Sequence, residues 1–553
     1  MCSSLQLLLA SSRAPGGTST TAAAPDRADL HRRAARPLVT RAAILALDLG
    51  TTSVKALLVD VDSGAPISFA RGSAGPHITT PDGGSEQAIE PWWSAVAETV
   101  RAALAIAAGE GRVEVRGIAT CGHGPSLVPL RADGTAAGTM ILWRDRRAAS
   151  DESVLAQALG RSGWLLAEMP KARWYLRERR EDAAQAAWLL STWDAAAYRL
   201  SGVAAASFWD PARSLSDVER AALRGESVGL DARALPPEVR PGTRLGGLTA
   251  ESAALLGLPA GIPVLAGLND GLAAVVGAGL TRAGLAVDVG GTAGGVAVAV
   301  SPSDGARIAH ARAGELWLGP APAPFGNLAV LGGAFAGTGK ILEWTMDELL
   351  ASHPAAARDQ RGALFEAAMA LPLSASSLIA RTPDAGIWSA HGSASDAFIA
   401  GASADEITNP AHLIRAAIEA GALAVAHLLA PARDLGLHID EVRLSGPATG
   451  ATSGPLSGAS IPPVGLPQLR ADIFDLPVVV PRIGETAAAG VAAVAGTGIG
   501  AYASLREATS AIVAPARRYE PAGGARREAA RALRERYAAS TVAHLRADAG
   551  GSR

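Results

Sequence analysis

The sequence predicts an α/β protein made of two similar lobes. Its 553 residues exceed what a single hydrophobic core usually accommodates. Apolar strand-like runs alternate with runs of helical periodicity, which is typical of α/β domains. A Gly-rich motif at the end of an apolar run occurs twice, starting at Leu45 and again at Leu285. Self-similarity of this kind favours duplicated lobes.

Composition excludes several classes of protein. With a net charge of -2 the chain has no basic bias toward nucleic acid or an anionic membrane surface. Its two cysteines exclude a disulfide framework and a cysteine-rich metal site. Apolar runs fall short of the roughly 18–20 residues that a membrane span needs. We therefore expect a small-molecule partner, with no nucleic acid and no membrane; a homodimer is one assembly that the sequence leaves open.

The chain divides into four predicted parts. Residues 1–42 are rich in Ser, Thr, Ala and Arg and are interpreted as a disordered extension or a targeting segment. Residues 43–279 form the predicted N-terminal lobe, 280–505 the C-terminal lobe, and 506–553 a helical tail. The predicted localisation is cytoplasmic, with a plastid or another organelle as the alternative if residues 1–42 are a transit peptide.

The two repeated motifs predict a strand, a Gly-rich turn and a second strand. The first contains Asp48, Gly50, Thr51, Thr52 and Ser53. Successive backbone N–H groups in such a turn suit phosphate oxygens. Asp48 would be repelled by phosphate, but it can hold a hydrated Mg²⁺ that bridges to phosphate. Two such turns facing each other across a cleft would grip the phosphates of a nucleotide, whereas either turn alone would be read as an ordinary hairpin.

Between and after the turns the alternation continues. Periodicity predicts helices over Glu90–Ala108, Ala183–Leu200, Pro410–Leu429 and Ala525–Asp548, and strands over Val115–Gly122 and Ile262–Ala266. Further along, "LPVVVP" reads as a strand and "ETAAAGVAAVAGTG" as a helix of small residues.

Candidate chemistry follows the strand ends. Asp270 comes after an apolar strand, where ligands bind in open α/β sheets, and has two interpretations: a general base, or a helix N-cap. Both can hold if Asn269 is the cap. His123 lies between two glycines and can bind a polyol or simply occupy a turn. Trp143 and Asp145 belong to a charged cluster that either orients sugar hydroxyls or forms surface salt bridges.

Seven stretches occur in the order typical of the FGGY family of carbohydrate kinases. They are "LDLGTTS" from Leu47, "EQAIEPWW" from Glu86, "GHG", "WRDRRA", "GLNDGLAAVVGAG", "GGTAGG" and "ETAAAGVAAVAGTG". The chain most resembles the xylulokinase-like members from Ile44 to about Tyr537. The resemblance implies two ribonuclease H-like (actin-like ATPase) lobes with the active site in the cleft between them. It also implies transfer of the γ-phosphate of ATP, with Mg²⁺, to a sugar hydroxyl.

The resemblance implies a role for individual residues of this chain. Asp270 resembles the catalytic base, and Asp48 the Mg²⁺-associated carboxylate. The predicted substrate-binding residues are Gly122, His123, Asn269, Asp270, Trp143 and Asp145. The predicted ATP-binding residues are Gly50, Thr51, Thr52, Ser53, Gly291, Thr292, Gly294, Gly446, Ala448 and Glu485.

The family resemblance leaves the acceptor open. D-Xylulose is the first expectation, and D-ribulose or a pentitol is an alternative. Gluconate is a further alternative, because Asn269-Asp270-Gly271 stands where xylulokinases usually carry Gly-Asp-Asn, and the Asp-Gly pairing resembles the gluconokinase-like members more closely. Two other classes of protein remain. One is an actin- or chaperone-like ATPase, which would not need Asp270 beside a polyol site. The other is a catalytically inactive sugar-binding sensor, suggested by the altered adenosine-side loop that follows Ser445.

Overall fold

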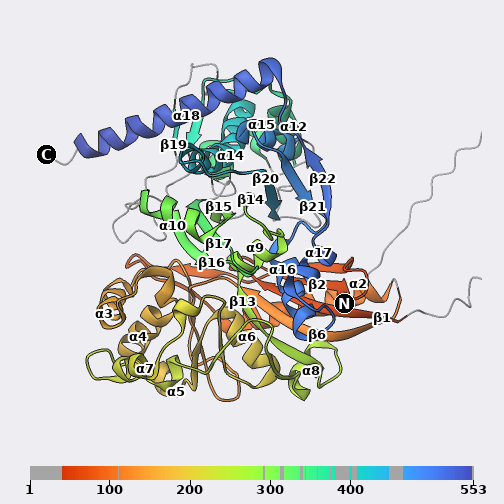
Figure 1. The fold of residues 1–553 in the computed structure, drawn as a ribbon, viewed down its shortest axis with the longest axis vertical. Coiled ribbons are helices and arrows are strands. Elements are labelled where there is room, and N and C mark those ends of the chain that lie inside the picture. The colour runs from red at the N-terminus through yellow and green to blue at the C-terminus, as the bar shows by residue number, and fades with distance from the viewer. Residues whose placement is uncertain are drawn as a thin grey trace, which may run out of the picture. The chain divides into compact units, whose positions relative to one another are not determined.

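The fold was analysed in a computed structural model of the full chain (Figure 1). It describes residues 40–109, 111–290, 293–311, 317–336, 341–342, 344–357, 359–373, 375–381, 398–400, 406, 408–446 and 465–550. All structural statements below concern these residues. The predictions for residues 1–39, Gly291, Thr292 and Ala448 lie outside them.

The first half of the chain is built on a six-stranded sheet in the order β12-β13-β6-β1-β2-β3. Its strands are β1 Arg41–Leu49, β2 Ser53–Asp60, β3 Pro66–Ser73, β6 Val113–Gly122, β12 Arg244–Gly247 and β13 Pro263–Asn269. Smaller sheets are formed by β4 His77–Thr79, β5 Ser85–Gln87 and β8 Met140–Ile141, by β7 Val128–Leu130 and β9 Trp188–Leu190, and by β10 Ala206–Ser207 and β11 Glu238–Val239. The helices are α2 Ile89–Ala108, α3 Ala149–Leu159, α4 Met169–Glu178, α5 Arg180–Gln185, α6 Thr192–Ser201, α7 Asp217–Arg224, α8 Ala250–Leu256 and α9 Asp270–Gly277.

The second half is built on a seven-stranded sheet in the order β16-β17-β15-β14-β20-β21-β22. Its strands are β14 Leu285–Val289, β15 Ala293–Val300, β16 Trp317–Pro322, β17 Ala329–Ala336, β20 Glu441–Ser445, β21 Val478–Pro481 and β22 Pro515–Tyr519; β18 Ile379–Arg381 pairs with β19 Phe398–Ala400. The helices are α10 Pro302–Ala311, α12 Arg361–Ala370, α14 Pro410–Asp434, α15 Leu466–Phe474, α16 Thr486–Gly498, α17 Leu505–Ile512 and α18 Gly524–Gly550.

The two sheets share one topology, which confirms the predicted duplication. In the first sheet β1 pairs antiparallel with β2 and parallel with β6, and β6 pairs parallel with β13. In the second, β14 pairs antiparallel with β15 and parallel with β20, and β20 pairs parallel with β21. Each sheet also ends in an antiparallel edge strand, β12 or β22. The repeated sequence motif therefore occupies the same place in both sheets.

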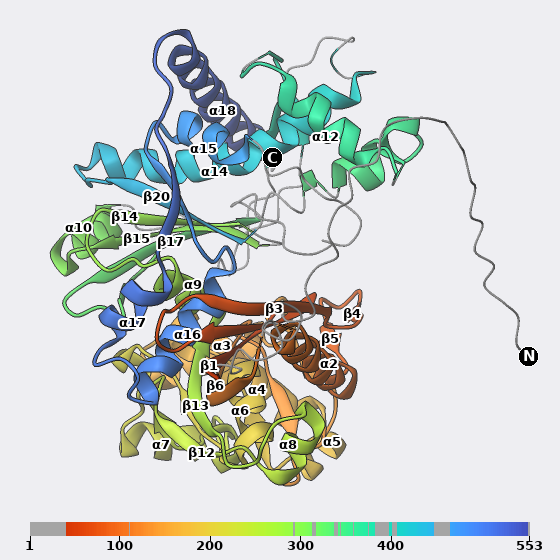
Figure 2. The same ribbon diagram turned by 90° about the vertical axis from the view of Figure 1, so that its right-hand side faces the viewer.

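Helices cover both faces of the first sheet. Alternate β1 residues face opposite sides, because successive side chains of a strand point to opposite faces. Leu45 and Leu47 pack with α2, α6 and α8, whereas Ile44 and Ala46 pack with α16. Helix α16 thus lies between β21 and β22 of the second sheet in sequence but completes the core of the first (Figure 2).

Helices α9 and α16 cross at backbone contact. A Cβ atom on Gly277 would lie 1.7 Å from the carbonyl oxygen of Thr486, and one on Gly490 would lie 1.8 Å from that of Ala273. Only glycine permits this approach. Because α9 also packs on β14, the pair couples the two sheets.

One sequence prediction of a helix is wrong. The run Ala183–Leu200 is divided into α5, strand β9 and α6. Leu190 pairs with Val128 of β7, and the side chain of Ser191 accepts a hydrogen bond from the backbone of Asp194, which starts α6 as an N-cap. Pairing with a distant strand therefore overrides the local alanine-rich helical pattern.

Helix α14 forms the core of the second half. By length and composition it could cross a membrane, with a mean hydropathy of 1.6 over Pro410–Ala430, but 89% of that window is buried inside the protein. Ile414, Ile418 and Val425 pack with the second sheet and with α12, α15 and α18. This is the burial of a core helix.

Candidate active site

Three adjacent parallel strands carry the candidate catalytic residues at their carboxyl ends. The register places Leu49 of β1 opposite Gly122 of β6, and Gly122 opposite Asn269 of β13. The side chains at the carboxyl ends of these strands therefore meet at one edge of the sheet, where ligands bind in α/β folds. The structure brings Asp48, His123 and Asp270 to this edge, as the sequence predicts.

Asp270 is the first residue of α9, and Asn269 is its N-cap. The Asn269 side-chain oxygen accepts a hydrogen bond from the Gly271 N–H at 2.9 Å, and Asp270 Oδ1 accepts from the same N–H at 2.7 Å. Burial and the neighbouring charge of Asp48 raise the pKa of Asp270 to about 7, although Gly271 and Lys55 oppose the rise. A carboxylate with this pKa suits general-base work near neutral pH.

A chain of charges links Asp48 to the start of α16. Lys55 Nζ lies 2.8 Å from Asp48 Oδ2 and 2.9 Å from Glu485 Oε2, and Arg71 Nη2 lies 2.5 Å from Glu485 Oε1. Burial would lower the pKa of Lys55, but Asp48 and Glu485 outweigh it and raise the pKa. Burial would likewise raise the pKa of Glu485, but Lys55 and Arg71 hold it below its usual value. Glu485, predicted to bind ATP, is therefore an ionised carboxylate beside the first turn.

Sequence reasoning did not assign Lys55 to the site. The signals that could have found it are its place directly opposite Asp48 in the β1–β2 pair and its rarity, since the chain has only three lysines.

His123 is buried beside this edge with one ring nitrogen free. Its side chain is 3% exposed; Nδ1 lies 2.8 Å from Ser126 Oγ, and Nε2 has no hydrogen-bond partner in the part of the chain that the structure describes. Burial and then the charge of Arg144 lower the pKa of His123 to about 3. The imidazole is therefore neutral, and Nε2 is available to a ligand hydroxyl.

Gln87 supplies a second unsatisfied polar atom and was not predicted as a site residue. It is 1% exposed, and its amide nitrogen donates to the carbonyl oxygens of Thr51 and Ala74 at 3.3 and 2.8 Å. Its Oε1 atom has no partner among the described residues. Buried polar groups are nearly always hydrogen-bonded, so Oε1 of Gln87 is available to a hydroxyl group bound beside it.

Trp143 and Asp145 have different surroundings. Trp143 Nε1 donates to Thr51 Oγ1 at 3.1 Å, which ties the tryptophan to the first turn. The Asp145 carboxylate accepts from the Ser85 N–H at 2.8 Å and from the Arg147 backbone and guanidinium. Both oxygens of Asp145 are thus engaged by the protein, and direct contact with substrate stays a prediction.

The turn between β1 and β2 requires glycine at position 50. The Gly50 N–H donates to the Ser53 carbonyl at 3.0 Å, and a Cβ atom at Gly50 would lie 2.8 Å from that oxygen. Thr51 and Thr52 occupy the tip. The backbone is therefore compact there, as a phosphate-binding turn requires.

The second turn is only partly described. Gly294 lies in β15 opposite Phe335. Gly446 follows β20 with φ of +60°, and a Cβ atom there would lie 2.8 Å from the Gly290 carbonyl oxygen. Its N–H donates to the Gly484 carbonyl at 2.8 Å. The predicted adenosine-side residue Gly446 thus lies beside both the second turn and Glu485.

The residues at the first turn fit a magnesium ion. Asp48 and Asp270 repel each other, and the nearby cation Lys55 is shared with Glu485. A divalent cation held by one or two carboxylates, water and phosphate oxygens would relieve that repulsion. Among the described residues no group of three or more His, Cys, Asp and Glu side chains is placed to hold a metal ion.

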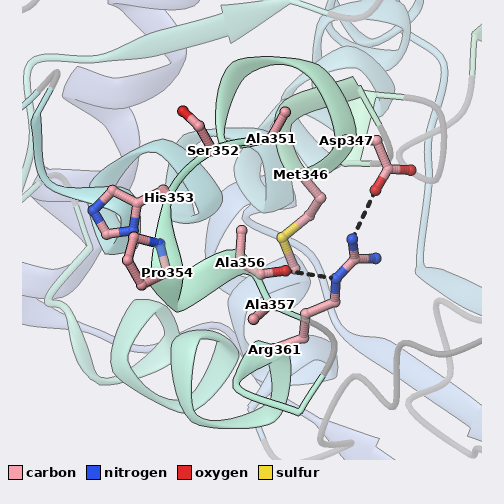
Figure 3. Close-up of a pocket in the computed structure, with 9 residues that line it drawn as sticks. All are labelled: Met346, Asp347, Ala351, Ser352, His353, Pro354, Ala356, Ala357 and Arg361. Atoms are coloured by element: carbon pink, nitrogen blue, oxygen red, sulfur yellow. Dashed lines mark hydrogen bonds and ion pairs between the residues drawn. The ribbon is translucent and has the colours of Figure 1, made fainter.

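A separate cavity of about 380 Å³ lies far along the chain from these residues (Figure 3). It is lined by Met346, His353 and Arg361 among others, and Arg361 donates to Asp347 at 2.7 Å. None of the predicted site residues lines it.

Comparison with known proteins identifies the family. The sequence model of the N-terminal domain of the FGGY family of carbohydrate kinases matches residues 43–277, and that of its C-terminal domain matches residues 321–499. Autoinducer-2 kinase of Yersinia pseudotuberculosis serotype O:3 (strain YPIII) is 28% identical over 514 residues, covering 86% of this chain and 90% of the relative.

Solved structures agree on the fold. Xylulose kinase from Rhodospirillum rubrum matches with a TM-score of 0.66 at 24% identity, and gluconate kinase from Lactobacillus acidophilus with 0.67 at 18%. Both matches cover 91% of this chain and 98% of the other. The chain therefore belongs to the FGGY family of carbohydrate kinases, ATP-using phosphotransferases of actin-like fold whose acceptor is an alcohol group of a small sugar-like molecule.

Proposed function

We propose that this chain transfers the γ-phosphoryl group of ATP to a hydroxyl of a small, open-chain polyhydroxylated substrate, with Asp270 as the general base. One observation carries the proposal. A carboxylate with a pKa of about 7 stands at the same sheet edge as the buried His123, whose Nε2 is unpartnered among the described residues. An actin-like ATPase that only changes conformation would need neither group.

The reaction can be written with every atom placed. The acceptor hydroxyl oxygen attacks the γ-phosphorus, the bond from phosphorus to the β,γ-bridging oxygen breaks, and ADP leaves. The hydroxyl proton passes to the Asp270 carboxylate and then to solvent. Phosphoryl transfer is catalysed mainly by positioning and charge stabilisation. The Gly50–Ser53 turn and the turn after β14 would hold the phosphates, and Asp48 would hold the Mg²⁺ that neutralises their charge.

Candidate acceptors follow from the sequence and from the relatives. D-Xylulose is the first to test, followed by D-ribulose, pentitols and gluconate. Autoinducer-2 joins the panel because it is named for a relative that covers most of this chain. A sugar sensor without turnover is the second candidate function, since "SGPATG" replaces the usual adenosine-side glycine run.

The test is ADP release from ATP and Mg²⁺ across this panel, with Asp270→Asn alongside the natural chain. One acceptor class should stimulate ADP release, and the variant should lose roughly two to four orders of magnitude, the typical contribution of a positioned base. Asp62→Asn, which changes an exposed carboxylate in the β2–β3 turn, is the matched control. Stimulation that survives in Asp270→Asn would remove Asp270 from this role. ATP binding without stimulation by any acceptor would favour the sensor.

A further inference from the structure

Arg144 is an arginine near the candidate acceptor site that has no counter-ion among the described residues. It follows β8, and its guanidinium lies 5.4 Å from the centre of the Trp143 ring. The side chain is half-buried, its Nε is buried without a hydrogen-bond acceptor, and it forms no ion pair within the described ranges. A guanidinium partly withdrawn from water with its Nε unpaired is stabilised by a ligand that accepts from it.

The neighbouring arginines show that this is specific to Arg144. Arg147, three residues later, lies 2.7 Å from Glu86 and 2.6 Å from Asp145, and these carboxylates raise its pKa although burial opposes them. Arg146 is exposed to solvent. Burial lowers the pKa of Arg144, and no acidic group offsets it. The protein therefore pairs or solvates its other arginines here and leaves Arg144 uncompensated.

The free guanidinium lies beside residues of the candidate site. Its charge contributes to the low pKa of His123, so the two side chains are close. Trp143, on which Arg144 stacks, is hydrogen-bonded to Thr51, and the amide nitrogen of Gln87 donates to the Thr51 backbone. Gln87 of β5 and Met140 of β8 are paired strand neighbours. Gln87 of β5 and Trp143, which follows β8 and precedes Arg144, thus both contact Thr51 of the first turn.

Arg144 and Asp270 have different charged neighbours. Asp270 shares its surroundings with Asp48 and Lys55, whereas Arg144 shares its surroundings with His123. An open-chain substrate whose reacting hydroxyl lies at Asp270 would extend past His123 and place its far end toward Arg144. Arginine binds planar carboxylates through two parallel hydrogen bonds.

We propose that the acceptor of this kinase carries a carboxylate, as an aldonate does, and that Arg144 binds it while Gln87 Oε1 and His123 Nε2 take hydroxyl groups. The inference rests on the proposed function of the same site, and it selects sugar acids over neutral ketoses and alditols. The other source of an anion near Arg144 is the transferred phosphoryl group of ATP, which the test must separate from a substrate carboxylate.

The experiment compares acceptors that differ only in the carboxylate. D-Gluconate is measured against D-glucitol, and D-xylonate against xylitol, with D-xylulose as the neutral ketose; kcat/KM for each acceptor and KM for ATP are recorded. Two variants change Arg144. Arg144→Gln removes the charge, and Arg144→Lys keeps the charge but loses the two parallel N–H donors of the guanidinium. Arg146→Gln, at an exposed arginine, is the matched control. Thermal unfolding reports whether each variant is folded.

The expected result is a preference of the natural chain for each aldonate over its alditol. Arg144→Gln should lower kcat/KM for the aldonates roughly ten- to hundredfold, chiefly through KM, the range expected for a hydrogen bond to a charged group. The alditols and the KM for ATP should change by less than about threefold. Arg144→Lys should recover part of the loss, and Arg146→Gln should match the natural chain.

Two results would overturn the inference: equal or better use of the neutral acceptors by the natural chain, or an Arg144→Gln effect on the KM for ATP in place of the acceptor. Calorimetric titration of D-gluconate without turnover keeps the two proposals separable. If no acceptor stimulates ADP release, the kinase proposal fails, while D-gluconate binding that Arg144→Gln weakens still supports the carboxylate site. Absence of aldonate binding to the folded natural chain rejects the site.

Discussion

Asp48 and Asp288 are counterparts in the two repeats, yet their surroundings differ. Each lies near the end of the first strand of its hairpin. Each of these strands has an antiparallel neighbour on one side and a parallel neighbour on the other. Asp48 stands opposite Lys55, whereas Asp288 stands opposite Val296. The second hairpin carries one extra residue in its turn, so the strand that returns is shifted by one position. Strand β15 carries no lysine or arginine, so no cation faces Asp288 from the returning strand.

The two aspartates therefore have different charged partners. Asp48 shares Lys55 with Glu485 and acts electrostatically on Asp270 at the sheet edge. Asp288 instead takes Arg470 of α15, with Nε 2.8 Å from Oδ2, and the two residues are 2% and 4% exposed. Burial raises the pKa of Asp288 although Arg470 opposes it. The aspartate of the first repeat therefore belongs to the candidate catalytic cluster, whereas its counterpart in the second repeat forms a sealed ion pair.

The largest expected effect is on stability at the sealed pair. Asp288→Asn leaves Arg470 buried with no other ion-pair partner among the described residues, so the free energy of unfolding should fall by about 3–5 kcal/mol. Asp48→Asn should cost less, because Lys55 keeps Glu485 as a partner. Chemical denaturation followed by circular dichroism measures both.

A double variant sharpens this contrast. Asp288→Leu combined with Arg470→Met removes both charges and should recover most of the lost stability, because an apolar pair can replace a buried ion pair at little cost. Equal stability of Asp288→Asn and the natural chain would show that Asp288 and Arg470 do not form a buried ion pair.

The helix crossing that joins the repeats gives the next effect. Gly277→Ala would place a methyl group 1.7 Å from the Thr486 carbonyl oxygen, so α9 and α16 must move apart. Overpacking of this kind costs about 1–3 kcal/mol, which denaturation would detect. Because Asp270 begins α9 and Glu485 precedes α16, activity should fall as well.

Gly362→Ala is the matched control for the crossing. Gly362 lies in α12 with no atom within 4 Å of its would-be Cβ, so alanine should stabilise the helix by about 0.5–1 kcal/mol. A similar gain from Gly277→Ala would mean that α9 and α16 do not touch at that glycine.

Much of the fold and the first carboxylates could be predicted from the sequence because their signals are local. An apolar run that ends in Asp-x-Gly marks a strand and its turn, and the run after Glu485 marks a helix of small residues. Asp270 and Asn269 were predicted to share the base and cap roles, and the structure shows Asn269 capping α9.

The remainder depends on packing between distant segments. Gln87 and Arg144 are distinguished by a buried polar atom that has no hydrogen-bond partner among the described residues. No sequence pattern predicts that such a partner is absent. Lys55 is linked to the candidate site by its ion pair with Glu485, a residue that is distant in the chain. The false helix over Ala183–Leu200 arose because the pairing of Leu190 with Val128 is likewise non-local.

The smallest effect is a shift in pH dependence that separates the two aspartates. Asp270 accepts a proton in the proposed step, so kcat/KM should rise about tenfold per pH unit below its pKa of about 7 and level off above it. Asp48→Asn removes a negative neighbour, which lowers the pKa of Asp270 and moves the acid limb to lower pH by roughly one unit or less.

Asp288→Asn is the control for this shift, because its carboxylate lies in the other sheet and is sealed against Arg470. At a temperature where that variant stays folded, its normalised pH profile should overlay that of the natural chain. A midpoint that moves equally in Asp48→Asn and Asp288→Asn would mean that the profile reports stability. A midpoint that moves only in Asp48→Asn would assign the acid limb to the carboxylates at the edge of the first sheet. It would also show that the aspartate of the first repeat has a role in the reaction that its counterpart in the second repeat lacks.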